Sequence, residues 1–116
     1  MKKKIASNKL TFRKEKFGDD LKPLGINGDF VVEFRHISEE ELDTLPTLPE
    51  RDDEEFARVW KTYYTNLALM SIKKWSWDKP VNIENFKKLP AVVTAAIKAN
   101  AFNYNIATEE DLKNLL

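Results

Sequence analysis

The sequence offers one histidine and no cysteine as candidates for catalysis or metal binding. His36 ends an alternating apolar segment, and Glu33 and Glu39 are the carboxylates nearest to it. General acid–base catalysis needs such a partner held within hydrogen-bond distance. Because nothing in the spacing fixes one, the pattern favours a surface histidine at a strand end, and we expect no enzymatic activity.

Carboxylates are the remaining candidates for metal ligands. Asp52, Asp53 and Glu55 follow one another closely, but their spacing matches no calcium-binding loop. Without cysteine, a thiolate metal site and a disulfide framework are both excluded, which fits a reducing compartment such as the cytoplasm. We therefore expect no metal and no cofactor.

Lysines beside aromatic residues suggest a third chemistry, the stacking of nucleic-acid bases. Such lysines form an N-terminal basic arm and flank Trp75 and Trp77: Lys2, Lys3, Lys4, Lys9, Lys73, Lys74, Lys87 and Lys88. The chain nevertheless has a net charge of zero and lacks a recognisable reading motif, whereas a dedicated binder is usually basic. A small nucleic-acid-binding regulator stays an alternative, but nucleic acid is not the partner that we expect.

The length and composition predict one folded domain over residues 1–116. The chain has 42% hydrophobic and 33% charged residues, typical of a globular protein. The positive start lacks the apolar run of a signal peptide, and no apolar run approaches the length of a membrane span, so we expect a protein that is neither exported nor membrane-bound. Residues 37–55 carry nine acidic residues against Arg51 alone, which indicates a solvated acidic connector with a short helix, or else a surface for a basic partner.

The β-rich part is expected over residues 1–36. Phe30, Val32 and Phe34 alternate with polar positions, as in a half-buried strand. The segment "KLTFRKEKF" repeats the alternation through Leu10, Phe12 and Lys14, and an Asn27-Gly28 turn is of the kind that joins paired strands. These features predict a small antiparallel unit.

Helices are expected after residue 37. Ser38 and Glu41 have capping-box spacing, and a long amphipathic helix is expected from Asp52 to Lys74, with acids in its first turn and lysines in its last. Asn82 is a good N-cap, and Pro90 suits the first turn of a helix that Asn105 closes. A terminal helix is expected to start at Thr108 and to dock through Leu112, Leu115 and Leu116. The predicted fold class is therefore α+β, mainly α, with an N-terminal antiparallel β unit followed by a helical bundle or hairpin over residues 56–116.

The tryptophans divide into two groups. Trp60 and Tyr63 lie on the apolar stripe of the long helix, which favours core packing. Trp75 and Trp77 alternate through Ser76 and would point to one side. There they would clamp two helices together, which we expect of at least one of them, or present an exposed aromatic anchor for a partner.

The segment "WSWDKPVNIENFKKLPAVVTAAIKA" resembles a pattern in small tail assembly chaperones of long-tailed phages and prophages: a tryptophan-aspartate turn, a proline, then "x-N/T-x-E-N-x-x-x-L-P" and an apolar helix. The resemblance covers Phe56 to Phe102, and "FVVEFRHISEEELDTL" is similar to the strand and short helix that often precede this pattern. Neither Trp75 nor the acidic connector has a counterpart in it. The matching residues are Trp77, Asp78, Pro80, Glu84, Asn85, Leu89 and Pro90.

The resemblance implies a non-enzymatic chaperone of tail morphogenesis in the cytoplasm of a bacterial host. Its partners would be the helical tape-measure protein, tail tube subunits, or both, and homo-oligomers are plausible. The runner-up is a structural tail or connector component that stays in the particle. A helix-in-groove contact would suit the chaperone, and the candidate partner-binding residues are Trp75, Trp77, Val93, Ile97, Phe102, Leu115 and Leu116.

Overall fold

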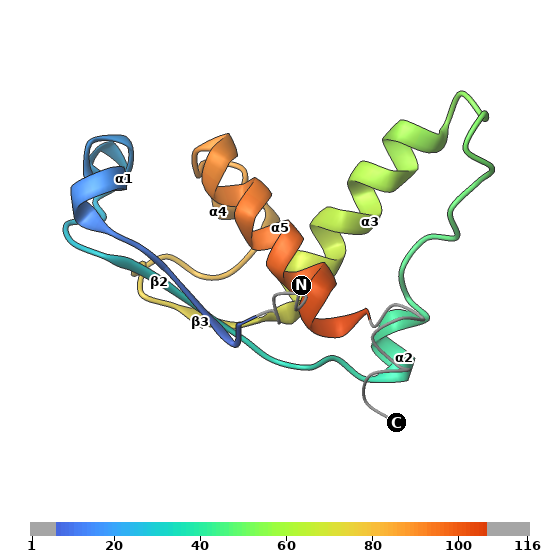
Figure 1. Cartoon of the computed structure of the whole chain (residues 1–116), viewed down its shortest axis with the longest axis horizontal. Helices are drawn as coiled ribbons and strands as arrows, with labels where there is room; N and C mark the ends of the chain where they lie inside the picture. The colour runs from blue at the N-terminus through green and yellow to red at the C-terminus, as the bar shows by residue number, and fades with distance from the viewer. Residues whose placement is uncertain (1–6, 107–116) are drawn as a thin grey trace, which may run out of the picture.

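The computed structural model describes residues 7–106, and Figure 1 shows their arrangement. A three-stranded sheet forms one layer, and helices cover one of its faces. The predicted α+β class, mainly α with a small antiparallel sheet, is confirmed. In chain order the elements are β1 (Lys9–Phe12), α1 (Lys14–Leu21), the 3-10 turn η1 (Lys22–Leu24), β2 (Phe30–Phe34), α2 (Glu39–Leu42), α3 (Phe56–Ser71), β3 (Ile72–Trp75), α4 (Ile83–Phe86) and α5 (Ala91–Asn105).

β2 is the central strand and pairs antiparallel with β1 and β3. As predicted, Phe30, Val32 and Phe34 are buried while the residues between them are only partly covered. Because successive side chains of a strand point to opposite faces of the sheet, this buried row points toward the helices. This row is the floor of the core.

The predicted continuation of the first strand through Lys14 is wrong, because Lys14 begins α1. The Asn27-Gly28 turn does not form a tight hairpin either, since α1 and η1 lie between β1 and β2. The backbone N–H of Lys14 donates to Oδ1 of Asp29 at 2.8 Å, which ties the start of the helix to the start of β2. Gly25, with φ of 83°, ends η1 in the left-handed conformation that glycine adopts without strain.

The third strand, β3, was not predicted, and it contradicts the expectation that Lys73 and Lys74 close the long helix. Ile72 pairs with Phe34 but Lys74 pairs with Glu33, so Lys73 is an extra residue at a β-bulge. The bulge explains why the strand was missed: it buries Ile72 and Trp75, three positions apart, instead of an alternating set.

The helix boundaries agree with several capping predictions. The Ser38 hydroxyl accepts from the backbone N–H of Glu41, whose side chain accepts from the N–H of Ser38, so the capping box of α2 is confirmed. The Asn82 side chain caps α4 as predicted, and α5 ends at Asn105 as predicted. The expected acidic first turn of the long helix is wrong, because Phe56 is its first residue and the acids precede it.

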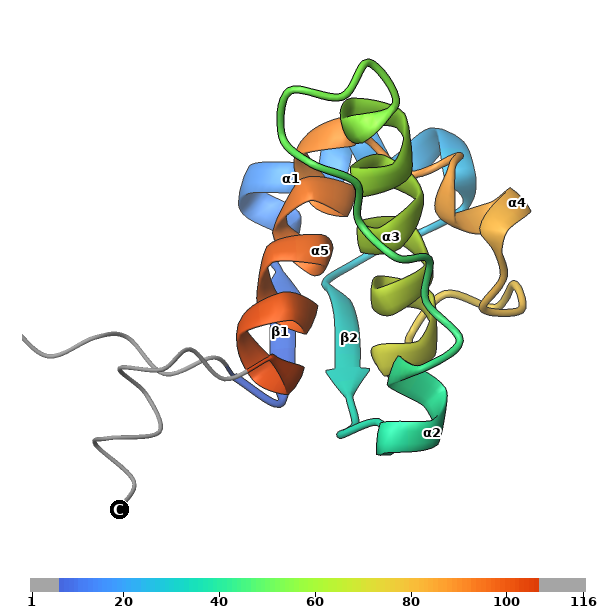
Figure 2. The same ribbon diagram turned by 90° about the vertical axis from the view of Figure 1, so that its right-hand side faces the viewer.

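In Figure 1 the two long helices, α3 and α5, form a V and approach each other at their C-terminal ends. There Nδ2 of Asn105 donates to Oγ of Ser71 at 2.8 Å, and the Asn105 side chain also accepts from the N–H of Ile37. The expected hairpin is therefore not formed, because β3 and α4 carry the chain back before α5 begins. Figure 2 shows α3 and α5 side by side, with the acidic connector passing over α3.

Two predictions at the chain ends lie outside the described residues: the basic arm of Lys2, Lys3 and Lys4, and the terminal helix with Leu112, Leu115 and Leu116. Within residues 7–106, no helix combines the length and the apolar character that crossing a membrane requires.

Candidate protein-binding surface

The structure places the side chains that were considered as candidates for catalysis or metal binding apart from one another. His36 is exposed, as expected, and its ring stacks on Tyr104 with centroids 4.0 Å apart. The carboxylate of Glu33 instead pairs with Nζ of Lys74 at 3.3 Å. In the part of the chain that the structure describes, no three histidine or acidic side chains come together as a metal-binding group.

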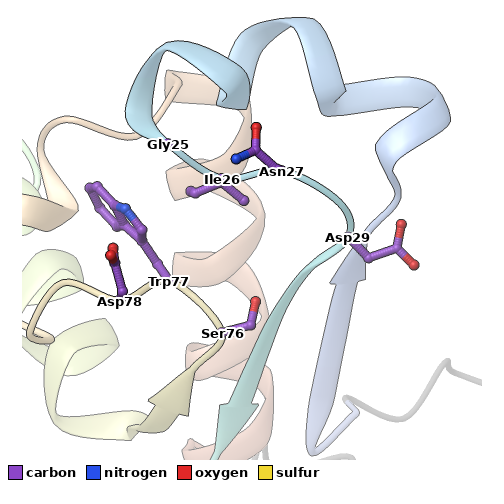
Figure 3. Close-up of a pocket in the computed structure, with 7 residues that line it drawn as sticks. All are labelled: Gly25, Ile26, Asn27, Asp29, Ser76, Trp77 and Asp78. Carbon is purple, nitrogen blue, oxygen red and sulfur yellow. The ribbon is translucent and has the colours of Figure 1, made fainter.

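A hollow with a volume of about 300 Å³ lies where the loop before β2 meets the tryptophan turn (Figure 3). Two of its polar side chains form hydrogen bonds with the backbone: Trp77 Nε1 donates to the Leu24 carbonyl at 3.1 Å, and Ser76 Oγ accepts from the N–H of Val31 at 2.9 Å. Figure 3 shows the Asp29 carboxylate turned away from the Trp77 ring. These contacts stabilise the fold and leave no nucleophile with a base beside it. The hollow is lined by Gly25, Ile26, Asn27, Asp29, Ser76, Trp77 and Asp78.

Trp75 and Trp77 are core residues. Their side chains are only 9% and 6% exposed, their ring centroids lie 5.6 Å apart, and Trp75 also contacts Phe30 at 6.0 Å. Trp75 Nε1 donates to the carbonyl of Lys79 at 2.7 Å, so both indoles have their N–H groups satisfied. Both tryptophans thus have a packing role, which we expected for at least one of them. Since neither ring is accessible, the base-stacking argument for nucleic acid loses its aromatic residues.

Most of the predicted partner-binding residues are likewise inaccessible. Val93 and Ile97 are fully buried beside the two tryptophans in one core cluster. Leu115 and Leu116 lie outside the described residues. Phe102 alone, on α5, is partly exposed. The predicted set therefore does not form a surface in this structure, because the face of α5 that carries Val93 and Ile97 is the one that packs on the sheet.

A different group of side chains forms an accessible apolar surface, which we call the aromatic face: Phe56, Trp60, Tyr63 and Tyr64 of α3 with Phe102 of α5. All five are partly buried, and none belongs to the core cluster or to the partly buried residues packed against it. Four of them lie within the first nine residues of α3, at the spacing that places side chains on one helix face. In Figure 1 this half of α3 diverges from α5.

Each of the other rings of the aromatic face contacts Trp60. The Phe56 and Tyr63 rings lie nearly parallel to it, with centroids 5.9 and 5.6 Å away. Tyr64 meets it edge to face at 4.4 Å, and Phe102 reaches it from α5 at 6.4 Å. Stacked and edge-to-face pairs each stabilise by about 0.5–1.5 kcal/mol beyond burial. Trp60 is thus the ring that contacts all four others of the aromatic face.

The polar atoms of the aromatic face have no partner among residues 7–106. Neither Nε1 of Trp60 nor the hydroxyls of Tyr63 and Tyr64 form a hydrogen bond there, and no buried side-chain nitrogen or oxygen in those residues lacks one. These groups therefore face solvent. Partial burial, and to a lesser degree the nearby Tyr63 hydroxyl, raise the pKa of Tyr64, so its hydroxyl stays a neutral donor.

Two lysines border the aromatic face. Lys61 follows Trp60 on α3 and is exposed, whereas Lys98 precedes Phe102 by one turn of α5 and is partly buried. Burial, and to a lesser degree the charge of Lys61, lower the pKa of Lys98. Neither forms an ion pair with a carboxylate of the described chain, where the pairs are Arg35–Glu41, Arg58–Glu55 and Lys74–Glu33.

The aromatic face was not recognised from the sequence, where Trp60 and Tyr63 were interpreted as core residues. That interpretation is wrong, because both side chains are partly exposed and lie outside the core cluster. The available signal was the residue type: four of the nine residues from Phe56 to Tyr64 are aromatic, and two of those carry hydroxyls, as at many binding surfaces.

Comparisons with protein-family models, with curated proteins and with solved structures find no match to this chain.

Proposed function

We propose that this protein is a non-enzymatic tail assembly chaperone, which binds helical segments of the tape-measure protein, of tail tube subunits or of both, in the cytoplasm of a bacterial host. The proposal draws its partner class from the sequence resemblance around Trp77 to Pro90. The single structural observation that supports it is the aromatic face, an ordered and partly exposed group of five rings outside the core.

The composition of the aromatic face suits a helical partner. Tryptophan and tyrosine supply much of the binding energy at protein interfaces, because large rigid rings lose little side-chain entropy. An amphipathic helix presents a continuous apolar stripe to such a surface, and a chaperone would cover that stripe before the tail assembles. The solvent-facing N–H and hydroxyl groups of Trp60, Tyr63 and Tyr64 would add hydrogen bonds at the edges of the contact.

The sequence motif contributes to this function by packing. Asn85 is 8% exposed; its backbone N–H is capped by the Asn82 side chain, and its Nδ2 donates to the Pro80 carbonyl at 2.8 Å. Leu89 is buried, and Pro90 precedes α5. The motif residues thus hold the turn between β3 and α5, which sets where Phe102 meets α3.

Co-expression with the proteins encoded beside this gene tests the proposal. The tagged wild-type protein should retain a helix-rich partner in a soluble complex, and Trp60→Ala should release it. Val92→Ala is the matched control, because Val92 is an apolar residue of α5 that is 58% exposed and lies outside the aromatic face. It should retain the partner.

Two results would count against the proposal. If Trp60→Ala and Val92→Ala retain the partner equally, the aromatic face is not the binding surface. If no partner is retained and the protein assembles by itself into rings or tubes, a structural tail or connector component is the better assignment.

A further inference from the structure

We infer that Lys61 and Lys98 make the aromatic face selective for amphipathic helices with acidic residues beside their apolar stripe. This inference rests on the proposed function and specifies the partner that the surface accepts. It starts from the position of the two lysines. Lys98 lies one helical turn before Phe102 on α5, and Lys61 lies three residues before Tyr64 on α3, so each cation neighbours a ring of the aromatic face. The centroids of the Tyr64 and Phe102 rings are 5.4 Å apart, which brings the two turns that carry the lysines together.

The charges of this pair are not compensated by the described chain. Each of the three ion pairs of residues 7–106 uses other cations, including Arg58, which pairs with Glu55 near the start of α3. Lys61 and Lys98 take part in none of the three pairs, so the edge of the aromatic face that they border carries two cations without an ion pair among residues 7–106. Two close cations repel each other, and burial of Lys98 strengthens that repulsion because water screens it less.

A partner carboxylate would relieve this repulsion. When a helix covers the rings it removes water from the lysines as well, and an unpaired charge left at such an edge weakens binding. A helix with glutamate or aspartate at the edge of its stripe supplies the missing anions, whereas a helix with lysine there adds further cations. The lysines thus discriminate against basic amphipathic helices as much as they favour acidic ones.

Direct titration with three synthetic peptides tests the selectivity. Each peptide is an amphipathic helix of about 18 residues, or five turns, with the same leucine stripe and with glutamate, glutamine or lysine on both edges. Binding to the full-length protein is followed by fluorescence anisotropy at about 50 mM and about 300 mM salt. The glutamate peptide should bind roughly three- to tenfold more tightly than the glutamine peptide at low salt, and the lysine peptide most weakly.

Two double variants test whether Lys61 and Lys98 cause the preference for the glutamate peptide. Lys61→Gln/Lys98→Gln should abolish the preference for glutamate and keep the affinity for the glutamine peptide. Lys73→Gln/Lys87→Gln removes the same charge from two exposed lysines away from the aromatic face, and it should leave the preference intact. Circular dichroism of each variant confirms that it is folded before binding is measured.

Several outcomes would overturn the inference. Equal binding of the three peptides, or equal loss of the preference in both double variants, would show that the lysines do not select. A dimer that Trp60→Ala dissociates, without peptide binding, would assign the aromatic face to contact between two copies. If the peptides bind without selectivity while co-purification depends on Trp60, the proposed function stands and only the inference fails.

Discussion

The three tryptophans of this protein occupy two regions with opposite properties. Trp75 and Trp77 are buried, and their indole N–H groups donate to backbone carbonyls. Trp60 is partly exposed, it contacts four other rings, and its N–H has no partner among residues 7–106. A buried and fully bonded indole stabilises the fold, whereas an accessible one within an ordered cluster is available for binding.

The difference arises from the backbone and not from the residue type. A bulge in β3 turns Ile72 and Trp75 to the same side of the sheet, and Trp77 follows into the core from the adjoining turn. Trp60 lies in the first half of α3, which diverges from α5 in Figure 1, and its side chain is only partly buried. An apolar stripe therefore predicts which face of a helix packs, but not how much of that face finds a partner within the same chain.

The largest effect should come from the buried region. Trp77→Ala removes a core indole and its bond to the Leu24 carbonyl, and we expect it to lower the free energy of unfolding by about 3–5 kcal/mol. This is a large share of the stability of a small domain. Urea unfolding followed by circular dichroism measures it.

Trp77→Phe separates packing from hydrogen bonding in the same position. It keeps most of the ring but leaves the Leu24 carbonyl without its donor, so the loss should be about 1–2 kcal/mol. If Trp77→Ala unfolds at the same urea concentration as the wild type, Trp77 is not part of the core and the contrast with Trp60 fails.

The local parts of this fold could be predicted from the sequence, and the non-local parts could not. The alternation of Phe30, Val32 and Phe34 and the caps at Ser38 and Asn82 depend on neighbouring residues, and the structure confirms them. β3 is different, because its pairing with β2 depends on residues about 40 positions away and a bulge hides its periodicity. The spacing of residues along the chain indicates neither the pairing with β2 nor the bulge.

The candidate site was harder to predict than the fold, for a related reason. The residues predicted to bind a partner are apolar, and four of them, Trp75, Trp77, Val93 and Ile97, are in the core. Only Phe102 belongs to the aromatic face. Whether an apolar side chain is covered depends on the direction of α5 relative to α3, and the expected hairpin gave the wrong direction.

A smaller effect on stability is expected in the accessible region. Trp60→Ala should lower the free energy of unfolding by about 1–2 kcal/mol, because the ring is only partly buried and the core beneath remains packed.

Acrylamide quenching of tryptophan fluorescence tests the contrast between Trp60 and the two buried tryptophans directly. The wild type should show one quenchable component, which Trp60→Phe removes while the protected emission of Trp75 and Trp77 persists. Full quenching of all three indoles would contradict the assignment of two of them to the core.

The smallest effect on stability should come from Glu41, which lies neither beside the buried tryptophans nor in the aromatic face. Its carboxylate accepts from both terminal nitrogens of Arg35, at 3.1 and 2.5 Å, and from the N–H of Ser38. The Arg35 guanidinium, followed by the Ser38 N–H, lowers the pKa of Glu41 from 4.5 to about 2. Because the folded pKa is the lower one, the stabilisation is complete above pH 4.5 and is lost as the pH falls from 4.5 toward 2.

Glu41→Gln should therefore unfold at a lower urea concentration than the wild type at about pH 6, and the gap should close near pH 2. Glu40→Gln removes the same charge from the same turn of α2, at a side chain that is exposed and forms no hydrogen bond with residues 7–106, and it should leave the midpoint nearly unchanged. A gap that persists undiminished at low pH would show that Glu41 stabilises by packing and not by its charge. The exposure of this pair keeps the effect below that of Trp60→Ala, because water and salt screen an ion pair more than they weaken a ring cluster.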